Sequence, residues 1–309
     1  MDSTGRAERG FTLIELSIVL VVIGLIIGSV LVGQDLIRAA GVRATISQVE
    51  KYNTAANTFR EKYNYLPGDI KDPDASNFGF QPRGTCPGEG DGNGLIEGSN
   101  TCAAGPGDES EGETLMFWVD LSTAHLIDGG FNTAQSAQNY NPISASTTPN
   151  LAALFPAAKI GRGNYIYVYA GGDVLGTPNG LNYFGISAIT DILSSNTYST
   201  PALTVQEAYA IDSKIDDGFP QSGRVTAQYL SFGGAPGWGN HGGAGTPNAG
   251  GVGANSTPVT TAIPGSSTTC YDNSTSSDGQ TAANGNAQHY SMEMSSGSGV
   301  NCALSFRFQ

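Results

Sequence analysis

The feature that most constrains this chain is an apolar run near its N-terminus. From Phe11 to Gly33 the sequence reads FTLIELSIVLVVIGLIIGSVLVG, and its one ionisable side chain is Glu15. A run of about 20 apolar residues is long enough to span the hydrocarbon core of a bilayer as a helix. The residues before the run are polar and include two arginines, which favours a cytoplasmic N-terminus and translocation of everything after the run. We therefore expect a transmembrane helix over about 12–33.

Two details of this run are unusual. An ordinary secretory signal is removed after its apolar stretch, at small residues of the A-x-A kind, and Ser29 to Gly33 offers small residues but no such site. Glu15 is the second, because an ionisable group inside a membrane segment is costly and needs a partner. A position near the interface, from which the carboxylate reaches water, is the alternative explanation for Glu15.

The residues R-G-F-T-L-I-E-L, from Arg9 to Leu16, resemble the signal sequence of type IV prepilins. The resemblance implies that residues 1–10 are a cytoplasmic leader, which a prepilin peptidase removes after Gly10 before methylating the new terminal amine of Phe11. It also implies that Glu15 meets the Phe11 amine of a neighbouring subunit in a filament. Two desolvated charges would then compensate each other, and the pair would set the axial stagger of the subunits.

The helix is expected to continue beyond the membrane to Tyr63. No proline interrupts the chain before Pro67, so one helix over 11–63 would measure about 80 Å at 1.5 Å per residue. The long N-terminal helix of pilins looks similar, although many of them have a proline near the end of the apolar run and this chain has none there. An apolar stripe with steps of three and four runs along one face of the second half, and its members are Val42, Ile46, Val49, Tyr52, Ala56, Phe59 and Tyr63.

The remaining residues, 64–309, are predicted to form an exported α+β head. Aromatic-rich alternation predicts strands, and Thr204 with Glu207 forms a T-x-x-E capping box at the start of a helix. Together these elements predict an antiparallel sheet with short helices packed on it. Residues 114–127 and 208–223 also resemble segments common in prepilin-type proteins. We expect helices at 111–127 and 204–214, and strands at 164–170, 181–187, 224–232 and 302–308.

Two stretches of the head lack apolar periodicity. Gly233–Ser267 and Asp272–Gly299 are rich in Gly, Ala, Asn, Ser and Thr, and their only large aromatic residues are Trp238 and Tyr290. Such composition predicts long, Gly-rich surface loops. A binding loop for a host surface, a polymer or DNA is the alternative interpretation.

The four cysteines form two groups, Cys86 with Cys102 and Cys270 with Cys302. Neither group has C-x-x-C spacing, and an even number in an exported chain indicates disulfides. A Cys270–Cys302 bridge would close a loop with little core of its own and contribute roughly 3–4 kcal/mol. Many type IV pilins have a similar C-terminal disulfide loop. Crossed pairing stays open, because four cysteines allow three connectivities.

The loop between the first two cysteines contains a candidate metal site. Its alternating oxygen-bearing residues, with glycine at the sixth place, resemble the first nine positions of an EF-hand loop, and calcium prefers six or more oxygen ligands. The twelfth position is Asn100 instead of Glu, so Glu109, Glu111 or Glu113 would have to complete the set. The alternative is a flexible glycine-rich turn. The candidate calcium ligands are Glu89, Asp91, Asn93, Leu95 through its carbonyl, and Glu97.

A second acidic group consists of Asp212, Asp216 and Asp217. It has the residue types of a metal site, but it follows directly on a predicted helix. We interpret it as a polar helix end and turn.

Other function classes are disfavoured. A net charge of -13 argues against bulk nucleic-acid binding, which requires clustered Lys and Arg. The histidines are His125, His241 and His289, and the chain has no H-E-x-x-H, P-loop or nucleophile-elbow motif. His125 is expected to pack on an amphipathic helix. We predict no enzymatic activity.

The resemblance therefore implies a structural subunit of a type IV pilus or pilus-like filament, assembled through its N-terminal helix. The implied partners are other pilins, the prepilin peptidase/methyltransferase and an inner-membrane assembly platform. The implied location is the inner membrane with a periplasmic head, and later an extracellular pilus or periplasmic pseudopilus. The alternatives are a pseudopilin of a type II secretion system and a minor pilin acting as an adhesin or DNA-uptake module. The large head favours a pilus subunit.

Overall fold

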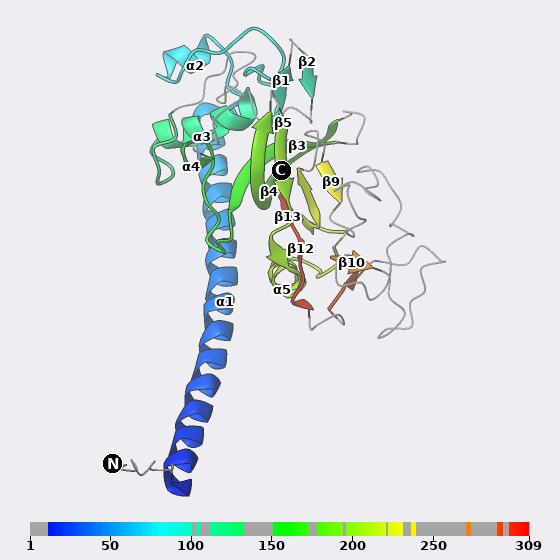
Figure 1. The fold of residues 1–309 in the computed structure, drawn as a ribbon. Helices are drawn as coiled ribbons and strands as arrows, with labels where there is room; N and C mark the ends of the chain where they lie inside the picture. Colours follow the sequence, from blue (N-terminus) through cyan, green and yellow to red (C-terminus); the bar gives the residue numbers. More distant parts are fainter. Residues whose placement is uncertain are drawn as a thin grey trace, which may run out of the picture. The chain divides into compact units, whose positions relative to one another are not determined.

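The structure is a computed structural model that describes residues 12–100, 103–105, 112–132, 151–172, 178–193, 196–220, 222–230, 236–238, 270–272, 289–292 and 297–308. The chain divides into two compact units, Met1–Gly41 and Val42–Gln309. The architecture is α+β as predicted, with a long N-terminal helix, an antiparallel sheet and short helices (Figure 1).

Helix α1 (Leu13–Tyr63) runs for 51 residues. It ends where Asn64 takes a φ of 61°, a left-handed conformation that Asn tolerates and that commonly closes helices. Pro67 follows shortly and cannot continue a helix. Within the described part of the chain, α1 is the one helix that is long and apolar enough to cross a membrane.

The predicted apolar stripe on the second half of α1 is confirmed, and it contains one buried amide. The Gln48 amide donates to the Tyr52 hydroxyl at 3.1 Å and to the Ala157 carbonyl at 2.9 Å, and it accepts from the Lys159 N–H at 2.8 Å. A polar group is tolerated in a core when it is hydrogen-bonded in this way. Val42, Val49, Tyr52, Ala56 and Phe59 are buried, and Ile46 and Tyr63 are partly buried.

The centre of the head is an antiparallel sheet with the strand order β3-β4-β13-β7, in which β4 also pairs with β5. Gly185 lies in the middle of β4, where a Cβ would come within 2.1 Å of the Tyr167 ring on β3. Because Gly185 has no side chain, the Tyr167 ring can lie over the backbone of β4 at this position. The strands are β3 (Asn164–Gly172), β4 (Pro178–Leu193), β5 (Asn196–Thr200), β7 (Val225–Thr226) and β13 (Leu304–Arg307).

Helix α3 (Glu113–Thr123) packs against both α1 and this sheet (Figure 1). The Trp118 ring lies 5.0 Å from the Tyr52 ring of α1, and the Phe117 ring lies 5.8 Å from the Phe184 ring of β4. Edge-on aromatic contacts of this kind stabilise a core beyond their buried area.

The helix predicted over 111–127 is shorter at its C-terminal end than expected. The N–H of Leu126 donates to the Leu121 carbonyl at 3.0 Å, and His125 has a φ of 58°. This bond is typical of a helix C-terminus that closes through a left-handed residue. The prediction that His125 packs on the helix is therefore wrong, because His125 follows its end and is exposed.

Helix α5 (Val205–Ile215) begins with the predicted capping box. The Thr204 hydroxyl accepts from the Glu207 N–H at 3.1 Å, and the Glu207 carboxylate accepts from the Thr204 N–H at 2.9 Å. The same carboxylate forms an ion pair with Arg162. Just before the helix, β6 (Leu203–Thr204) pairs with β12 (Val300–Cys302).

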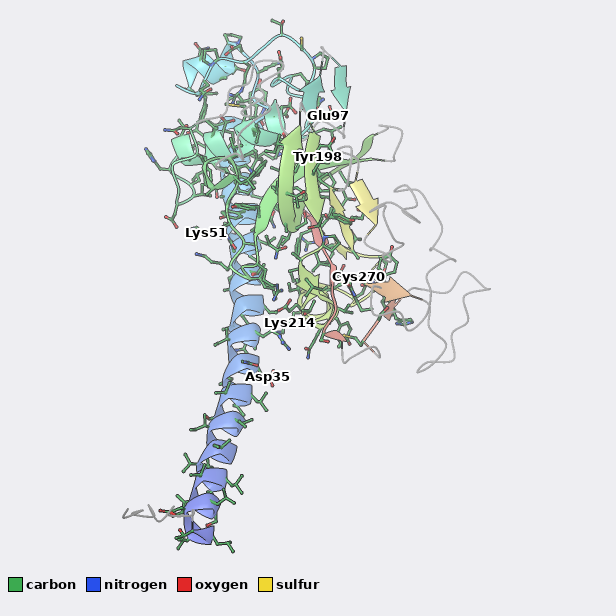
Figure 2. All side chains as sticks on the ribbon, in the orientation of Figure 1. Asp35, Lys51, Glu97, Tyr198, Lys214 and Cys270 are labelled. Atoms are coloured by element: carbon green, nitrogen blue, oxygen red, sulfur yellow. A yellow bond between two sulfur atoms is a disulfide. The ribbon has the colours of Figure 1, made fainter. Side chains whose placement is uncertain are left out.

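A disulfide joins Cys302 at the end of β12 to Cys270, with their Cα atoms 5.0 Å apart. Figure 2 shows Cys270 next to β10. Cys86 is also disulfide-bonded, and Cys102 lies outside the described residues.

The strand predicted over 224–232 is interrupted. The N–H of Ala227 donates to the Pro220 carbonyl at 2.7 Å instead of the sheet, which separates β7 from β8 (Gln228–Leu230). Similarly, the predicted strand over 302–308 is observed as the end of β12 followed by β13. Short elements that the sequence did not reveal are α2 (Asp74–Asn77), α4 (Leu151–Leu154), β1 (Gly98–Asn100) and β2 (Ala103–Gly105).

The two predicted loops include short strands. β9 (Pro236–Trp238) pairs with β8, and β10 (Tyr271–Asp272) pairs with β11 (His289–Tyr290). Tyr290 is buried in the core, so it is not a surface-loop residue. Most of both loops lies outside the described residues.

Candidate functional site

The N-terminal end of α1 is closed by Thr12 and Glu15. The Glu15 carboxylate oxygen Oε2 accepts from the Thr12 backbone N–H and the Thr12 hydroxyl, each at 2.8 Å, and the Glu15 N–H donates to that hydroxyl at 3.3 Å. This is a capping box, which satisfies N–H groups that the first helical turn leaves unpaired. The T-x-x-E spacing was the sequence signal for it. Gly10 and Phe11, the predicted processing site, lie outside the described residues.

The first half of α1 presents an apolar surface in the unit Met1–Gly41. Its large apolar side chains, from Leu13 to Ile37, are between 46% and 86% exposed. A continuous apolar surface of this size is stable in hydrocarbon or against other apolar helices. This half of α1 therefore requires a bilayer or neighbouring helices around it.

A buried network of carboxylates organises the glycine-rich loop of the head, and Asp69 is its first member. One carboxylate oxygen of Asp69 accepts from the N–H groups of Gly92 and Asn93 at 2.8 and 3.0 Å, and the other accepts from Gly94 at 2.9 Å. Gly92 and Gly94 have φ values of 77° and 88°, which suit glycine. Asp69 thus holds three consecutive N–H groups of a chain segment more than 20 residues away.

Glu113, the first residue of α3, holds the two ends of the same loop. Its Oε1 accepts from the N–H groups of Gly90 and Asp91 at 3.0 and 3.2 Å, and its Oε2 accepts from Glu97 at 3.0 Å. The carboxylate is fully buried. Hydrogen bonds from several backbone N–H groups are what make such burial tolerable.

Asp120 of α3 is a third buried carboxylate next to this network. It forms a buried ion pair with Arg83, whose Nη2 lies 2.6 and 2.5 Å from its two oxygens, and it accepts from the Gly68 N–H at 2.7 Å. Gly68 has a φ of 87°, and a Cβ there would lie 2.4 Å from the Glu113 carbonyl oxygen. The L-P-G-D turn therefore fits against α3 only with glycine at this position.

Asp69 and Glu113 lie close to a third carboxylate, that of Asp91. Carboxylate oxygens of Asp69, Asp91 and Glu113 are within 4.8 Å of one another. Burial, assisted by the Asp91 charge, raises the pKa of Asp69 to about 7. Burial and the nearby Asp69 charge raise the pKa of Glu113 well above its usual value. Neutralisation by a proton or by a cation would therefore stabilise this arrangement.

The five predicted calcium ligands do not all belong to this group. The Asn93 amide nitrogen donates to Asp91 and Glu97, both at 3.1 Å, so it lies where a cation between the two carboxylates would lie. Glu89 instead accepts from the Cys86 N–H at 3.1 Å, and its other oxygen is buried without a hydrogen-bond partner. The Leu95 N–H donates to the Asn93 side chain at 2.7 Å. Figure 2 shows Glu97 next to β1.

Sequence reasoning did not find Asp69 as a member of this group. It named Glu113 only as one of three alternatives for a missing ligand. The available signal was an acidic residue within an apolar context in each case, in L-P-G-D-I and E-T-L-M-F-W. Charged residues are rarely buried without a defined partner, so such positions indicate a polar network.

The second acidic group, Asp212, Asp216 and Asp217, also lies within 4.8 Å. Asp212 accepts from the Tyr290 hydroxyl, which is distant in sequence, at 2.8 Å. Each member also accepts a hydrogen bond from the segment after α5: Asp212 from the Gly218 N–H at 3.2 Å, Asp216 from the Val225 N–H at 3.2 Å, and Asp217 from the Phe219 N–H at 2.8 Å. These bonds close the turn after α5 and support the interpretation as a polar helix end. Burial raises the pKa of Asp212 to about 7.

Comparison with known proteins identifies the N-terminal region. Residues 5–31 match the model of the prokaryotic N-terminal methylation motif, which is the signature of type IV pilins and pseudopilins. Searches of curated proteins and of solved structures found no match. The matched residues include the start of α1, with Thr12 and Glu15.

We expect Gly68→Ala to destabilise the head more than Gly79→Ala. Both glycines have positive φ, 87° and 83°, but only Gly68 has atoms within 4 Å of the position of a new Cβ. The conformation alone costs about 1–2 kcal/mol, and the clash at Gly68 adds about 1–3 kcal/mol. Urea unfolding of the full mature chain in detergent measures both. Equal losses would contradict the packing of Gly68 against Glu113.

Without divalent cations, stability should fall as pH rises from about 5 to 7.5. The raised pKa values of Asp69 and Glu113 mean that the folded chain binds more protons than the unfolded chain, so deprotonation destabilises it. A tenfold difference in proton affinity between the folded and unfolded chains corresponds to about 1.4 kcal/mol. Asp212 contributes with the same sign. Urea unfolding at a series of pH values in a chelator measures this dependence.

Asp91→Asn tests how far the Asp91 charge contributes to this pH dependence, because it removes that charge from beside Asp69 and keeps one of the two side-chain acceptors that Asn93 uses. Its unfolding free energy should fall less steeply over the same pH range. Parallel slopes for this variant and the parent chain in a chelator would show that the three carboxylates do not interact.

Proposed function

We propose that this chain, which carries the N-terminal methylation motif, is a structural subunit of a type IV pilus or pilus-like filament. The observation that supports this best is the first half of α1, an exposed apolar helix whose one acidic group before Asp35 is Glu15. In a soluble monomer, this apolar surface would be exposed to water, which is unfavourable. A subunit that passes from a bilayer into a bundle of identical helices keeps it covered in both places.

The proposed assembly step uses the geometry at Thr12. Prepilin peptidase would cleave after Gly10, leaving the positively charged amine of Phe11 next to the capping box. Among the described residues, the contacts of the Glu15 carboxylate use Oε2, so Oε1 is the oxygen that a neighbouring subunit's amine would approach. Within one chain the carboxylate then keeps its own donors, and in a filament it gains an ion pair as well.

The proposed location follows from the same segment. The leader would remain in the cytoplasm, α1 would lie in the inner membrane and the head in the periplasm, until an assembly platform moves the subunit into a filament. An extracellular pilus and a periplasmic pseudopilus are both consistent with the motif. The large head, from residue 64 onward, favours a pilus subunit over a secretion pseudopilin. Because close packing along a filament suits smaller heads, the head size also favours a minor or tip subunit.

We also propose that the group Asp69, Asp91 and Glu113 binds a divalent cation of the calcium class. The three carboxylates supply only oxygen atoms, which calcium prefers, and their mutual repulsion is not offset by a basic side chain among the described contacts. The Asn93 amide nitrogen donates to both Asp91 and Glu97, so a cation would have to displace this amide to bring Glu97 into the candidate shell. The role would be structural, because the cation would fix the loop between two elements of the head.

Glu15→Ala should leave processing intact and reduce filament assembly strongly. The change removes the carboxylate that would pair with the neighbouring amine, while the apolar helix still inserts. Mass spectrometry of the mature N-terminus and electron microscopy of sheared surface filaments measure the two steps. Glu61→Ala removes an exposed carboxylate near the other end of α1 and is the matched control. Normal filament yield from Glu15→Ala would refute the assembly role.

Calcium should raise the melting temperature of the mature chain in detergent at pH 7. Cation binding would offset the repulsion, and the gain grows with ligand concentration as expected for binding to the folded state only. Asp91→Asn should lose most of this response and should be more stable than the parent chain in a chelator. A melting temperature that does not change with calcium would exclude the cation site.

A further inference from the structure

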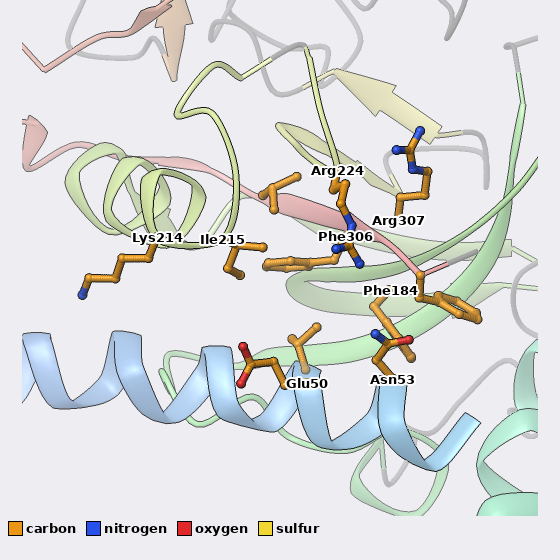
Figure 3. Close-up of a pocket in the computed structure, with 11 residues that line it drawn as sticks. Glu50, Asn53, Phe184, Lys214, Ile215, Arg224, Phe306 and Arg307 are labelled. Carbon is orange, nitrogen blue, oxygen red and sulfur yellow. The ribbon is translucent and has the colours of Figure 1, made fainter. Parts of the chain in front are cut away.

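A groove of about 310 Å³ lies on the head between the second half of α1, the end of α5 and the sheet edge formed by β7 and β13 (Figure 3). Its floor is apolar and comes from the sheet and α1, with Val49, Phe184, Val225 and Phe306 nearly or fully buried. The rim is charged. The volume is that of a few side chains, near the lower end of the about 300–1,000 Å³ typical of ligand pockets.

The rim of the groove is basic, although the protein is acidic. Lys214, Arg224 and Arg307 line it together with one carboxylate, Glu50. The whole chain has 27 acidic and 14 basic residues, so the local balance of three to one is the reverse of the global one. Figure 3 shows the guanidinium of Arg224 pointing toward α1 across the groove, and that of Arg307 pointing away from α1.

These basic side chains have no partner in the part of the chain that the structure describes. Three other basic residues are paired with carboxylates: Arg83 with Asp120, Arg162 with Glu207 and Lys51 with Asp128. The side chains of Lys214 and Arg224 form neither a hydrogen bond nor an ion pair with any described residue. Arginine next to an apolar floor is well suited to bind a carboxylate through two parallel hydrogen bonds.

We propose that this groove binds an acidic segment of a second copy of this chain. Two carboxylates of the neighbour would pair with Arg224 and Lys214, which lie well apart along the groove (Figure 3), and an apolar side chain between them would lie over the floor near Phe306. Charge complementarity supports this occupant, because chains with a net charge of -13 repel one another, and a basic groove provides one place where they attract and fix their register. This inference rests on the proposed filament function.

Carbodiimide cross-linking of intact filaments tests the contact directly, because the reagent joins a lysine amine to a carboxylate only when the two are in contact. Filaments assembled from a mixture of isotopically light and heavy chains distinguish links between copies from links within one. We expect Lys214 to be joined to an Asp or Glu of another copy. Lys214→Arg keeps the charge and should lose the link. A link from Lys214 to Glu50 of the same chain alone would overturn the proposal.

Arg224→Glu tests the energetic role of the groove. Reversing this charge should lower filament yield at least about tenfold, equivalent to about 1.4 kcal/mol per contact. Arg60→Glu makes the same charge change at an exposed position of α1 outside the groove and should change the yield much less. Equal melting temperatures in detergent would show that both variants fold. If Arg224→Glu does not fold, the cross-link from Lys214 in the parent chain decides whether the groove contacts another copy.

The controls separate the two proposals. If the parent chain forms no filament, the proposed function fails and the groove has no copy to bind. If the parent chain forms filaments and Arg224→Glu forms them equally well, the filament function stands and the groove proposal is wrong. A groove that instead binds a small anion would give neither links between copies nor a loss of yield, which also refutes the proposal.

Discussion

The structure depends first on how a carboxylate is tolerated at the start of an apolar helix. A charge in a low-dielectric environment is retained only when hydrogen bonds or an opposite charge replace the water that it loses. Glu15 receives two such bonds from Thr12, within its own first turn. The carboxylate is therefore hydrogen-bonded within its own chain, and in the proposed filament a neighbour's amine would be an additional interaction. Under that proposal, the site suits a step between two environments.

The head also contains buried carboxylates that are stabilised by hydrogen bonds, but here the donors are remote in sequence. Asp69, Glu113 and Asp120 are all buried, and each accepts backbone N–H groups from a segment remote in sequence. Their donors come from the glycine-rich loop and the L-P-G-D turn, so the carboxylates fix the backbone of these segments next to the core residues Leu66, Ile70 and Ile96. They also accumulate negative charge, and this is why a proton or cation is the natural complement of the cluster.

Elements with a local cause were predictable from the sequence. The apolar stripe of α1 follows from residue spacing, and the capping box of α5 follows from Thr204 and Glu207, so both were found. The break between β7 and β8 depends on a bond from Ala227 to Pro220, and the early end of α3 depends on one from Leu126 to Leu121; neither has a clear pattern in the sequence. The glycine-rich loop suggested a ligand set within itself, because its oxygens alternate. In the structure, the acidic group instead includes Asp69 and Glu113, which come close to the loop only through the tertiary fold.

Helix α1 also determines how the head and the membrane segment can act together. Its second half is not a stalk attached to a finished domain, because Tyr52 contacts Trp118 and Phe59 is completely buried in the core. A core residue of this kind leaves its position only if the surrounding core opens, which costs several kcal/mol for a single large side chain. The same helix that begins with the exposed apolar segment therefore ends as part of the packed core. In the proposed filament, the helix that makes the assembly contacts would then also be a part of the head's core, with no separate linker between the two roles.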